Sequence, residues 1–203
     1  MAQNTVPTKN NLMRARHSLR LAAVGYDLMD RKRNILVREV MRYMDEAKSL
    51  QAQVAEKYRE AYEALMIATV RMGDCAEAAR AVPTDDALTI TSRSVMGVEL
   101  PAVTLAESPR RLWYSPVDTD AALDTAYDKF REVMALTAKL AETEASVCRL
   151  ADAIKKTRKR TNALGNVMIP QLETTVREIS ASLEEKERED FTRLKVIKRV
   201  TEE

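Results

Sequence analysis

The chain has 203 residues with only 4 Gly and 6 Pro, whereas 32% of its residues are charged, 45% are hydrophobic and 4% are aromatic. This composition is typical of long helices that pack along narrow apolar seams, and it excludes a collagen-like, a disulfide-rich or a wholly disordered chain. The 33 basic and 31 acidic residues leave a net charge of +2, so any attraction to nucleic acid or to an anionic membrane must be local.

The first predicted element is a helix over about 12–72 that carries a long apolar seam. Steps of alternately three and four residues visit seventeen positions, of which fifteen are apolar. These positions are Leu12, Ala15, Leu19, Ala22, Tyr26, Met29, Arg33, Leu36, Val40, Tyr43, Ala47, Leu50, Val54, Lys57, Ala61, Ala64 and Ala68. Three or four heptads suffice to predict a coiled coil, and this pattern persists for longer. At the charged position Arg33, the side chain either sets the register or extends to solvent.

The middle of the chain differs in composition, because half of the Gly and Pro residues gather there. They include four of the six prolines and are Pro83, Gly97, Pro101, Pro109 and Pro116. Alternating residues predict two short strands joined by a turn at Met96–Gly97, with Gly97 as the turn residue. The alternating residues are Leu88, Ile90 and Ser92, then Val98, Leu100 and Ala102. An isolated hairpin is marginally stable in water, so we expect it to rest on the helices or on a partner.

The second long helix is expected to begin near Ser115–Pro116 or Asp118. Its seam is interrupted by polar residues around Arg158 and Thr161 and then resumes in a shifted register. The seam positions are Leu123, Ala126, Phe130, Val133, Leu140, Val147, Ala151 and Ile154, then Ile169, Leu172, Val176, Ile179 and Leu183, and finally Phe191 and Leu194. Pro170 deprives one carbonyl of its helical donor, so we expect a kink there, loosened further by Gly165.

These elements predict an all-α protein, a long antiparallel two-helix coiled coil with a short central β-hairpin and an irregular or short helical segment. Its regions are an N-terminal arm (1–78), a central hairpin and connecting region (79–117) and a C-terminal arm (118–203). Folding back of the second arm onto the first would place both termini at one end of a rod. The seam residues expected to hold the arms together are Leu19, Tyr26, Leu36, Val40, Leu50, Val54, Ile154, Leu172 and Ile179.

The sequence offers no catalytic, cofactor-binding or metal site that we would support, so we expect a chain that is not an enzyme by itself. His17 is the only histidine, and we interpret it as an exposed helix residue. Cys75 and Cys148 lack metal-type spacing and suit a reducing cytosol. There is no phosphate-binding glycine motif, no apolar run long enough to span a membrane and no apolar signal-peptide core. A cytoplasmic protein is therefore expected.

A basic cluster in the second arm has several interpretations. It comprises Lys155, Lys156, Arg158, Lys159 and Arg160. It is either a solvated helix face or a docking surface for an acidic partner, and a nucleic-acid site is less favoured because no aromatic stacking residues lie nearby. The heptad periodicity alone is also compatible with another class of protein, a free-standing coiled-coil adaptor or tether, including a membrane-curving homodimer.

Several segments make the sequence recognisable. They are Pro7-Thr8-Lys9-x-x-Leu12 with SLRLAAVGYDLMDRKRNIL (18–36), SRSVMGVELP (92–101), KKTRKRTNALGNVMIPQLETTVREI (155–179) and LEEKEREDFTRLKVIK (183–198). In this order they resemble the D subunit of V-type (A/V-type) rotary ATPases. Two departures are Gly165, where the family more often has an acidic residue, and Asn34, where Asp is usual.

The resemblance implies a central rotor-shaft subunit that transmits torque between ATP hydrolysis or synthesis in the catalytic head and ion translocation by the membrane ring. It implies no chemistry in this chain and no cofactor. The implied partners are the catalytic A and B subunits, the F subunit and the membrane-side connector (the C or d subunit), with the 85–116 region facing the F subunit or the lower assembly. The implied location is the cytoplasmic face of the membrane, with no direct span and no nucleic acid. The head-contact candidates are Lys155, Lys156, Arg158, Lys159, Arg160, Arg188 and Arg193.

Overall fold

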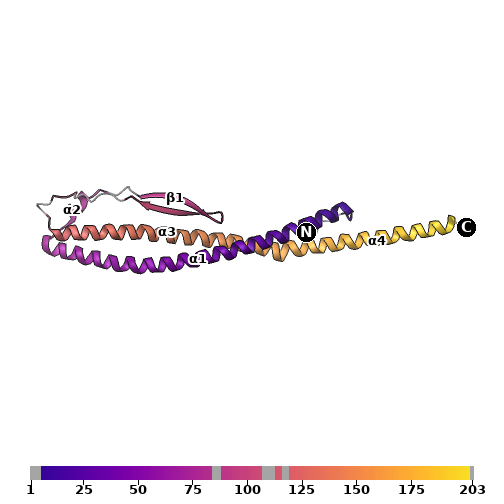
Figure 1. The fold of residues 1–203 in the computed structure, drawn as a ribbon, viewed down its shortest axis with the longest axis horizontal. Helices are drawn as coiled ribbons and strands as arrows, with labels where there is room; N and C mark the ends of the chain where they lie inside the picture. The colour runs from indigo at the N-terminus through magenta and orange to yellow at the C-terminus, as the bar shows by residue number, and fades with distance from the viewer. Residues whose placement is uncertain (1–5, 84–87, 107–112, 116–118, 202–203) are drawn as a thin grey trace. The chain divides into compact units, whose positions relative to one another are not determined.

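The structure, a computed structural model, describes residues 6–83, 88–106, 113–115 and 119–201. The predicted fold class is confirmed, since the chain combines a long N-terminal helix and a long C-terminal helical region with one antiparallel hairpin (Figure 1). In chain order the elements are α1 (Lys9–Met72), α2 (Ala76–Ala81), β1 (Leu88–Val95), β2 (Val98–Leu105), α3 (Ala121–Ala163), the π-helical turn η1 (Leu164–Met168) and α4 (Ile169–Thr201).

Local sequence signals explain where the long helices begin and end. Thr8 caps α1, because its Oγ1 accepts the Asn11 N–H at 3.2 Å. After Met72, Gly73 adopts φ 85° and donates its N–H to the Thr69 carbonyl at 2.9 Å, an ending that favours glycine. Helix α3 begins at Ala121, later than expected, and the predicted starts Pro116 and Asp118 lie outside the described residues.

The chain divides into two units. The central unit comprises residues 35–154, and the terminal unit comprises residues 1–34 together with residues 155–203. Each unit contains one stretch of α1 and one stretch of the C-terminal helical region.

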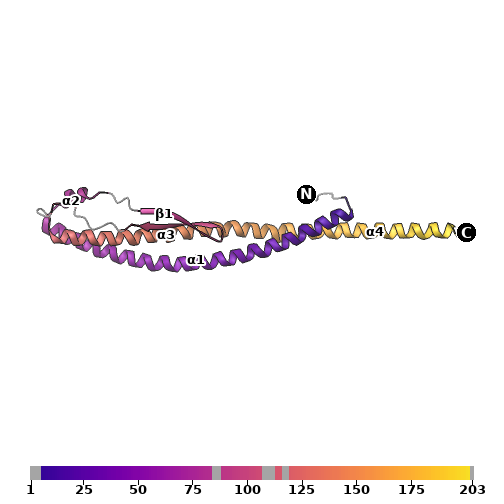
Figure 2. The same ribbon diagram turned by 45° about the horizontal axis from the view of Figure 1, so that its top comes forward.

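In the central unit, α1 and α3 run antiparallel. Gln51 Nε2 donates to Glu144 Oε1 at 2.8 Å, and farther along α1 Arg71 Nη1 lies 3.2 Å from Asp120 Oδ2. Residue numbers therefore rise along one helix as they fall along the other. The hairpin lies alongside α3 in both views (Figure 1, Figure 2).

The core of the central unit is narrow and joins three elements. It consists of Leu36, Tyr43, Leu100 and Leu150, against which Val40, Val95, Val98, Val147, Ala153 and Ile154 pack. Beyond this cluster, the buried seam positions of α1 are mostly alanines: Ala47, Ala61, Ala64 and Ala68. Such small side chains allow the facing helix to approach closely.

The α3 seam differs in part from the expected one. Leu150 is fully buried and Ala151 is exposed, so the expected seam position at Ala151 is wrong. Thr143 and Ser146 are also buried there. Our prediction followed apolar residues, whereas the buried face includes small hydroxyl residues. Thr143 Oγ1 can be buried because it donates to the Lys139 carbonyl of its own helix at 2.6 Å.

In the terminal unit, the first part of α1 runs opposite to α4 (Figure 1). Its buried residues are Ala22, Thr157, Thr161 and Ile179. Thr161 Oγ1 donates to the Thr157 carbonyl at 3.0 Å, which satisfies the hydroxyl without a partner from another helix. Every residue from 184 to 201 is exposed, including Phe191 and Leu194, so the last part of α4 carries an uncovered apolar surface.

Candidate functional surfaces

The predicted seam residues occupy inward positions at most sites. Leu36, Leu50, Val54 and Ile179 are buried, and Leu19, Val40, Ile154 and Leu172 are half-buried. Tyr26 is 38% exposed, and its ring lies close to Gly165. A Cβ added at Gly165 would lie 2.7 Å from Tyr26 Cε2, so the glycine makes room for this ring. The glycine that departs from the resembled family thus has a packing role here.

The seam of the C-terminal region changes register by one residue at the π turn. Steps of three and four residues lead through Ile154, Thr157 and Thr161 to Leu164, and the seam continues at Leu172, Val176, Ile179 and Leu183. A π turn closes i→i−5 hydrogen bonds, as the Ile169 N–H does with the Leu164 carbonyl, and so accommodates one extra residue. Pro170, which has no N–H to donate, follows directly as the second residue of α4. A kink at Pro170 stays a prediction.

The basic cluster of the second arm points outward. Lys155, Lys156, Arg158, Lys159 and Arg160 are all exposed, whereas Thr157 between them is buried. None of these five cations forms an ion pair with another residue of the described ranges. The cluster therefore presents uncompensated positive charge on a helix whose opposite face is packed.

The two other predicted head-contact residues have a different environment. Arg188 Nη1 lies 3.4 Å from Glu185 Oε2, and Arg193 Nη2 lies 3.7 Å from Glu189 Oε2. Both pairs are on the exposed end of α4, where the acidic neighbours offset the charge locally. Such exposed pairs contribute little to stability and remain available to a partner.

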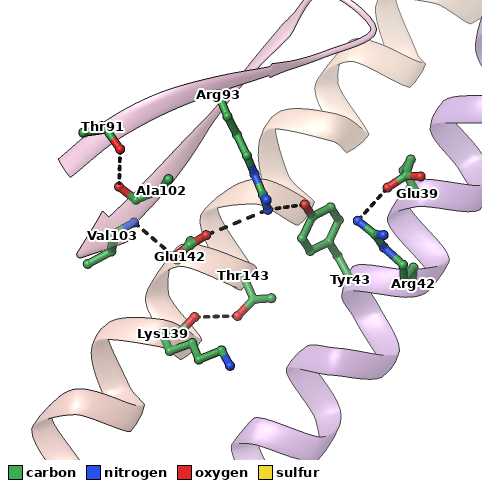
Figure 3. Close-up of polar contacts among 10 residues, drawn as sticks. All are labelled: Glu39, Arg42, Tyr43, Thr91, Arg93, Ala102, Val103, Lys139, Glu142 and Thr143. Atoms are coloured by element: carbon green, nitrogen blue, oxygen red, sulfur yellow. Dashed lines mark hydrogen bonds and ion pairs between the residues drawn. The ribbon is translucent and has the colours of Figure 1, made fainter. Parts of the chain in front are cut away.

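A polar junction fastens the hairpin to both long helices of the central unit, and the sequence did not reveal it (Figure 3). The Arg93 side chain extends from β1, donates a hydrogen bond to the Tyr43 hydroxyl of α1 and lies 3.9 Å from Glu142 Oε1 of α3. Glu142 Oε2 also accepts the Val103 N–H of β2 at 3.0 Å. Because Tyr43 is only 3% exposed, its hydroxyl requires such a partner. Each of these contacts joins residues that are 39 or more positions apart, so no local pattern could have indicated it.

Four charged residues cross-link α1 and α3 farther along the central unit. Lys57 Nζ lies 3.2 Å from Glu60 Oε2 and 3.8 Å from Glu132 Oε2, and Lys129 Nζ lies 3.6 Å from Glu60 Oε2. The hydrogen bond from Lys57, together with the charges of Lys57 and Lys129, lowers the pKa of Glu60 below its ordinary value. The hydrogen bond to Glu60 and its charge raise the pKa of Lys57. Lys57 is therefore a charged position of the seam that has partners on both helices.

An apolar groove lies between α1, α2 and α3 in the central unit, with a volume of about 390 Å³. Its walls include Leu65, Val82, Tyr127 and Phe130. Tyr114, also in the wall, donates its hydroxyl hydrogen to Asp124 Oδ1 at 2.6 Å and makes an edge contact with the Tyr127 ring. Of the residues that line this groove, Tyr114 lies within the 85–116 region, and the contact of that region with the F subunit or the lower assembly stays a prediction.

The described residues contain neither a metal-type cluster of side chains nor a membrane-spanning helix. No group of three or more His, Cys, Asp or Glu side chains in these ranges is arranged to hold a metal ion. Likewise, none of the helices in the described ranges carries an apolar stretch long enough to cross a membrane. His17 and Cys148 are exposed, and Cys75 is half-buried.

Comparison with known proteins identifies the family. A family model described as the ATP synthase D subunit matches residues 11–199. The D subunit of the V-type ATP synthase of Thermotoga neapolitana is 42% identical over 197 residues, which cover 96% of this chain and 97% of that protein. The chain belongs to the ATP synthase D-subunit family. The matched range includes both long helical regions and the hairpin, so the resemblance found in the sequence is confirmed.

A-type members of the D-subunit family are similar over nearly the same length. The D subunit of the A-type ATP synthase of Pyrococcus furiosus is 37% identical over 201 residues, which cover 97% of this chain and 94% of that protein. That of Methanobrevibacter smithii is 36% identical, with 100% of this chain and 91% of that protein covered. Membership in the D-subunit family implies partner subunits within an ATP synthase complex.

Proposed function

We propose that this chain is the central rotor-shaft subunit of its complex. In this role it transmits torque between ATP hydrolysis or synthesis in the catalytic head and ion translocation by the membrane ring. The observation that supports this role best is the antiparallel pairing of long helices along a narrow seam, seen within the central unit and again within the terminal unit. The chain itself would perform no catalytic step.

Cross-helix contacts suit the central unit to bear torsion. The apolar core around Leu36 and Leu150 resists separation of α1 and α3. The bonds Gln51–Glu144 and Arg71–Asp120 oppose sliding of one helix along the other, because they join defined positions of the two helices. A twist applied to one helix would therefore be passed to the other.

The basic cluster is the surface that we assign to the catalytic head, with Arg188 and Arg193 as further contacts. Five cations without ion-pair partners among the described residues would complement acidic or polar loops of a surrounding collar. A shaft with charge on one side contacts successive catalytic interfaces differently, so its rotation would bias which nucleotide site is open. This is allostery by differential contact.

The remaining partners follow from the same role. The A and B subunits would form the head, and the F subunit and the membrane-side connector (the C or d subunit) would bind elsewhere on the shaft. The hairpin and the groove between α1, α2 and α3 are the surfaces that we assign to the F subunit or the lower assembly. The complex would hold this chain at the cytoplasmic face of the membrane as a peripheral component.

Purification of the native complex through a tag on this chain tests the proposal. We expect two large subunits to co-purify with one copy of this chain for each hexameric head, together with ATP hydrolysis. A Leu50→Asp variant should lose the complex, because Leu50 is buried between the helices, whereas Ala52→Asp on the exposed face should retain it. Recovery of this chain only as a dimer without ATPase activity would contradict the proposal and favour a coiled-coil adaptor.

A further inference from the structure

The two edges of the hairpin differ in how their backbone groups are used. Val95 and Val98 flank the two-residue turn Met96–Gly97, where φ is 51° and 74°, as a type I′ turn requires. Hydrogen-bonded and non-hydrogen-bonded pairs alternate away from the turn, so every second residue directs its N–H and C=O away from the hairpin. The outward-directed residues are Glu99, Pro101, Val103 and Leu105 on β2 and Leu88, Ile90, Ser92 and Ser94 on β1.

The outer edge of β2 is closed by the chain itself. The Val103 N–H donates to Glu142 Oε2, and the Glu99 carbonyl accepts from Arg149 Nη1 at 3.0 Å. Between these two residues, Pro101 has no N–H to offer and is buried. Another strand therefore has no place on this side of the hairpin.

The outer edge of β1 is open. The sheet has two strands, and within the described ranges no other residue hydrogen-bonds to the outward groups of Ile90, Ser92 or Ser94. The strand is eight residues long and contains neither Pro nor Lys, and its one charged side chain, Arg93, is held in the junction with Tyr43 and Glu142. Proteins usually protect such an edge with a charge, a proline or a bulge, because an unprotected edge pairs with other strands.

We infer that the outer edge of β1 binds an extended segment of another subunit as a third strand. The backbone of that segment would supply the hydrogen bonds that Ile90, Ser92 and Ser94 lack. Leu88 and Ile90 point to one side of the strand and are 43% and 67% exposed, so the bound segment should carry apolar side chains at alternate positions. The inference rests on the proposed function in one respect, since the partner is a subunit of the same complex.

Hydrogen exchange at single-residue resolution tests this inference without any mutation. The amides of Ile90, Ser92 and Ser94 should exchange rapidly in the isolated chain and about tenfold or more slowly in the purified complex that hydrolyses ATP. The amides of Thr91 and Arg93 belong to the hairpin ladder and serve as the internal control, since they should be protected in both samples. Equal exchange at Ile90, Ser92 and Ser94 in both samples would overturn the inference while leaving the shaft role intact.

A proline at an outward position provides the second test. Ser92 pairs with Pro101 across the hairpin, so Ser92→Pro removes an outward N–H without removing a ladder hydrogen bond. Ser92→Thr is the matched control, because it keeps the N–H. In the complex, Ser92→Pro should abolish the added protection at Ile90 and Ser94 while Thr91 and Arg93 stay protected, and Ser92→Thr should change neither. Retained protection at Ile90 and Ser94 in a proline variant with an intact ladder would overturn the inference.

Two further outcomes are distinguishable. Protection of Ile90, Ser92 and Ser94 in the isolated chain, together with a dimeric mass by sedimentation, would identify a second copy as the occupant and overturn the assignment to another subunit. Failure to recover an ATP-hydrolysing complex would overturn the proposed function, and the inference with it.

Discussion

At the scale of single residues, polar contacts between distant positions hold the hairpin and the helices of the central unit together. The Tyr43 hydroxyl is buried and receives its hydrogen bond from Arg93, whose guanidinium also lies 5.7 Å from the centre of the Tyr43 ring. A hydrogen bond from a charged donor to a buried hydroxyl contributes more than one between neutral groups. The Tyr43 hydroxyl is therefore one of several attachments of the hairpin, together with Glu142, Arg149 and the buried Leu100.

Substitution Tyr43→Phe should loosen the hairpin without unfolding the helices. The ring and its contacts with the Arg42 and Arg93 guanidinium groups remain, but the hydrogen bond, which contributes about 1.5 kcal/mol, is lost. Hydrogen exchange at Thr91 and Arg93 should accelerate about tenfold, while circular dichroism at 222 nm stays unchanged. Tyr62→Phe is the control, because Tyr62 is 58% exposed and its ring contacts are retained. Unchanged exchange at both hairpin amides would show that the hydroxyl does not fasten the hairpin.

The ion cluster around Glu60 should make the central unit sensitive to acid. Because the pKa of Glu60 is lowered in the folded chain, its stabilising effect is complete above the ordinary pKa of 4.5 and is lost as the pH falls through the lowered value. The midpoint of thermal unfolding should therefore be higher for the native chain than for Glu60→Gln at pH 7, and the difference should vanish at acidic pH. At alkaline pH the same reasoning applies to Lys57, whose pKa is raised. Its stabilising effect is complete below the ordinary pKa of 10.5 and is lost as the pH rises through the raised value.

Salt provides the control for this prediction, because the groups are partly exposed. Raising the ionic strength from about 0.1 M to 1 M shortens the screening length from about 10 Å to 3 Å, so the difference at pH 7 should shrink. A difference between the native chain and Glu60→Gln that is the same at every pH would exclude an ionic origin.

At the scale of elements, the π turn keeps the seam of the terminal unit facing inward. Between Thr161 and Leu172 the sequence has one residue more than the heptad pattern allows, so without the π turn the seam before η1 would lie one residue out of phase with the seam after it. The turn also precedes Pro170, whose missing N–H would interrupt a continuous α-helix. A single irregular turn thus accommodates both features.

Deletion of Val167 should convert the π turn into a regular α-helical turn when it is combined with Pro170→Ala. Val167 is 49% exposed, so its removal creates no cavity, and the alanine restores the N–H that a continuous helix needs. We expect thermal unfolding close to that of the native chain. Deletion of the exposed Thr174 is the matched control, since it rotates Ile179 out of the seam and should destabilise the unit by about 2 kcal/mol. Equal destabilisation by both deletions would contradict the role assigned to η1.

At the scale of the whole molecule, charge rather than hydrophobicity distinguishes one stretch of the surface. The net charge of the chain is only +2, yet five cations occupy the six positions 155–160. A partner attracted by this stretch would not be attracted by the surface in general. The cluster is therefore the part of the proposed shaft whose role can be tested separately from its stability.

Reversal of Lys156, Arg158 and Arg160 to Glu should weaken binding to the catalytic head and lower ATP turnover in a reconstituted complex. All three side chains are exposed, so the helix pair should stay folded. We expect binding to weaken by about tenfold or more, with the largest effect at low salt. The control reverses Lys48, Arg59 and Arg80, which are exposed in the central unit. Unchanged binding and turnover in the first variant would contradict the assignment of this surface to the head.

The sequence by itself determined the elements and their class. The seam from Leu12 to Ala68 predicted the long helix α1, because a repeat of three and four residues can form a continuous stripe only on a helix. The alternation around Met96–Gly97 predicted the hairpin for the corresponding reason, since alternate residues share one face of a strand. Both patterns involve residues that are close in sequence, so they predict the helix and the hairpin without knowledge of any distant contact.

Only the tertiary structure decided which distant polar groups meet and which face of α3 is buried. Thr143, Ser146, Thr157 and Thr161 are buried although they are polar, because facing helices that approach closely select small side chains rather than apolar ones. The junction of Arg93, Tyr43 and Glu142 unites three elements, and the closed edge of β2 depends on Glu142 and Arg149 of α3. Such contacts follow from how the elements pack against one another, and no repeat along the chain encodes that.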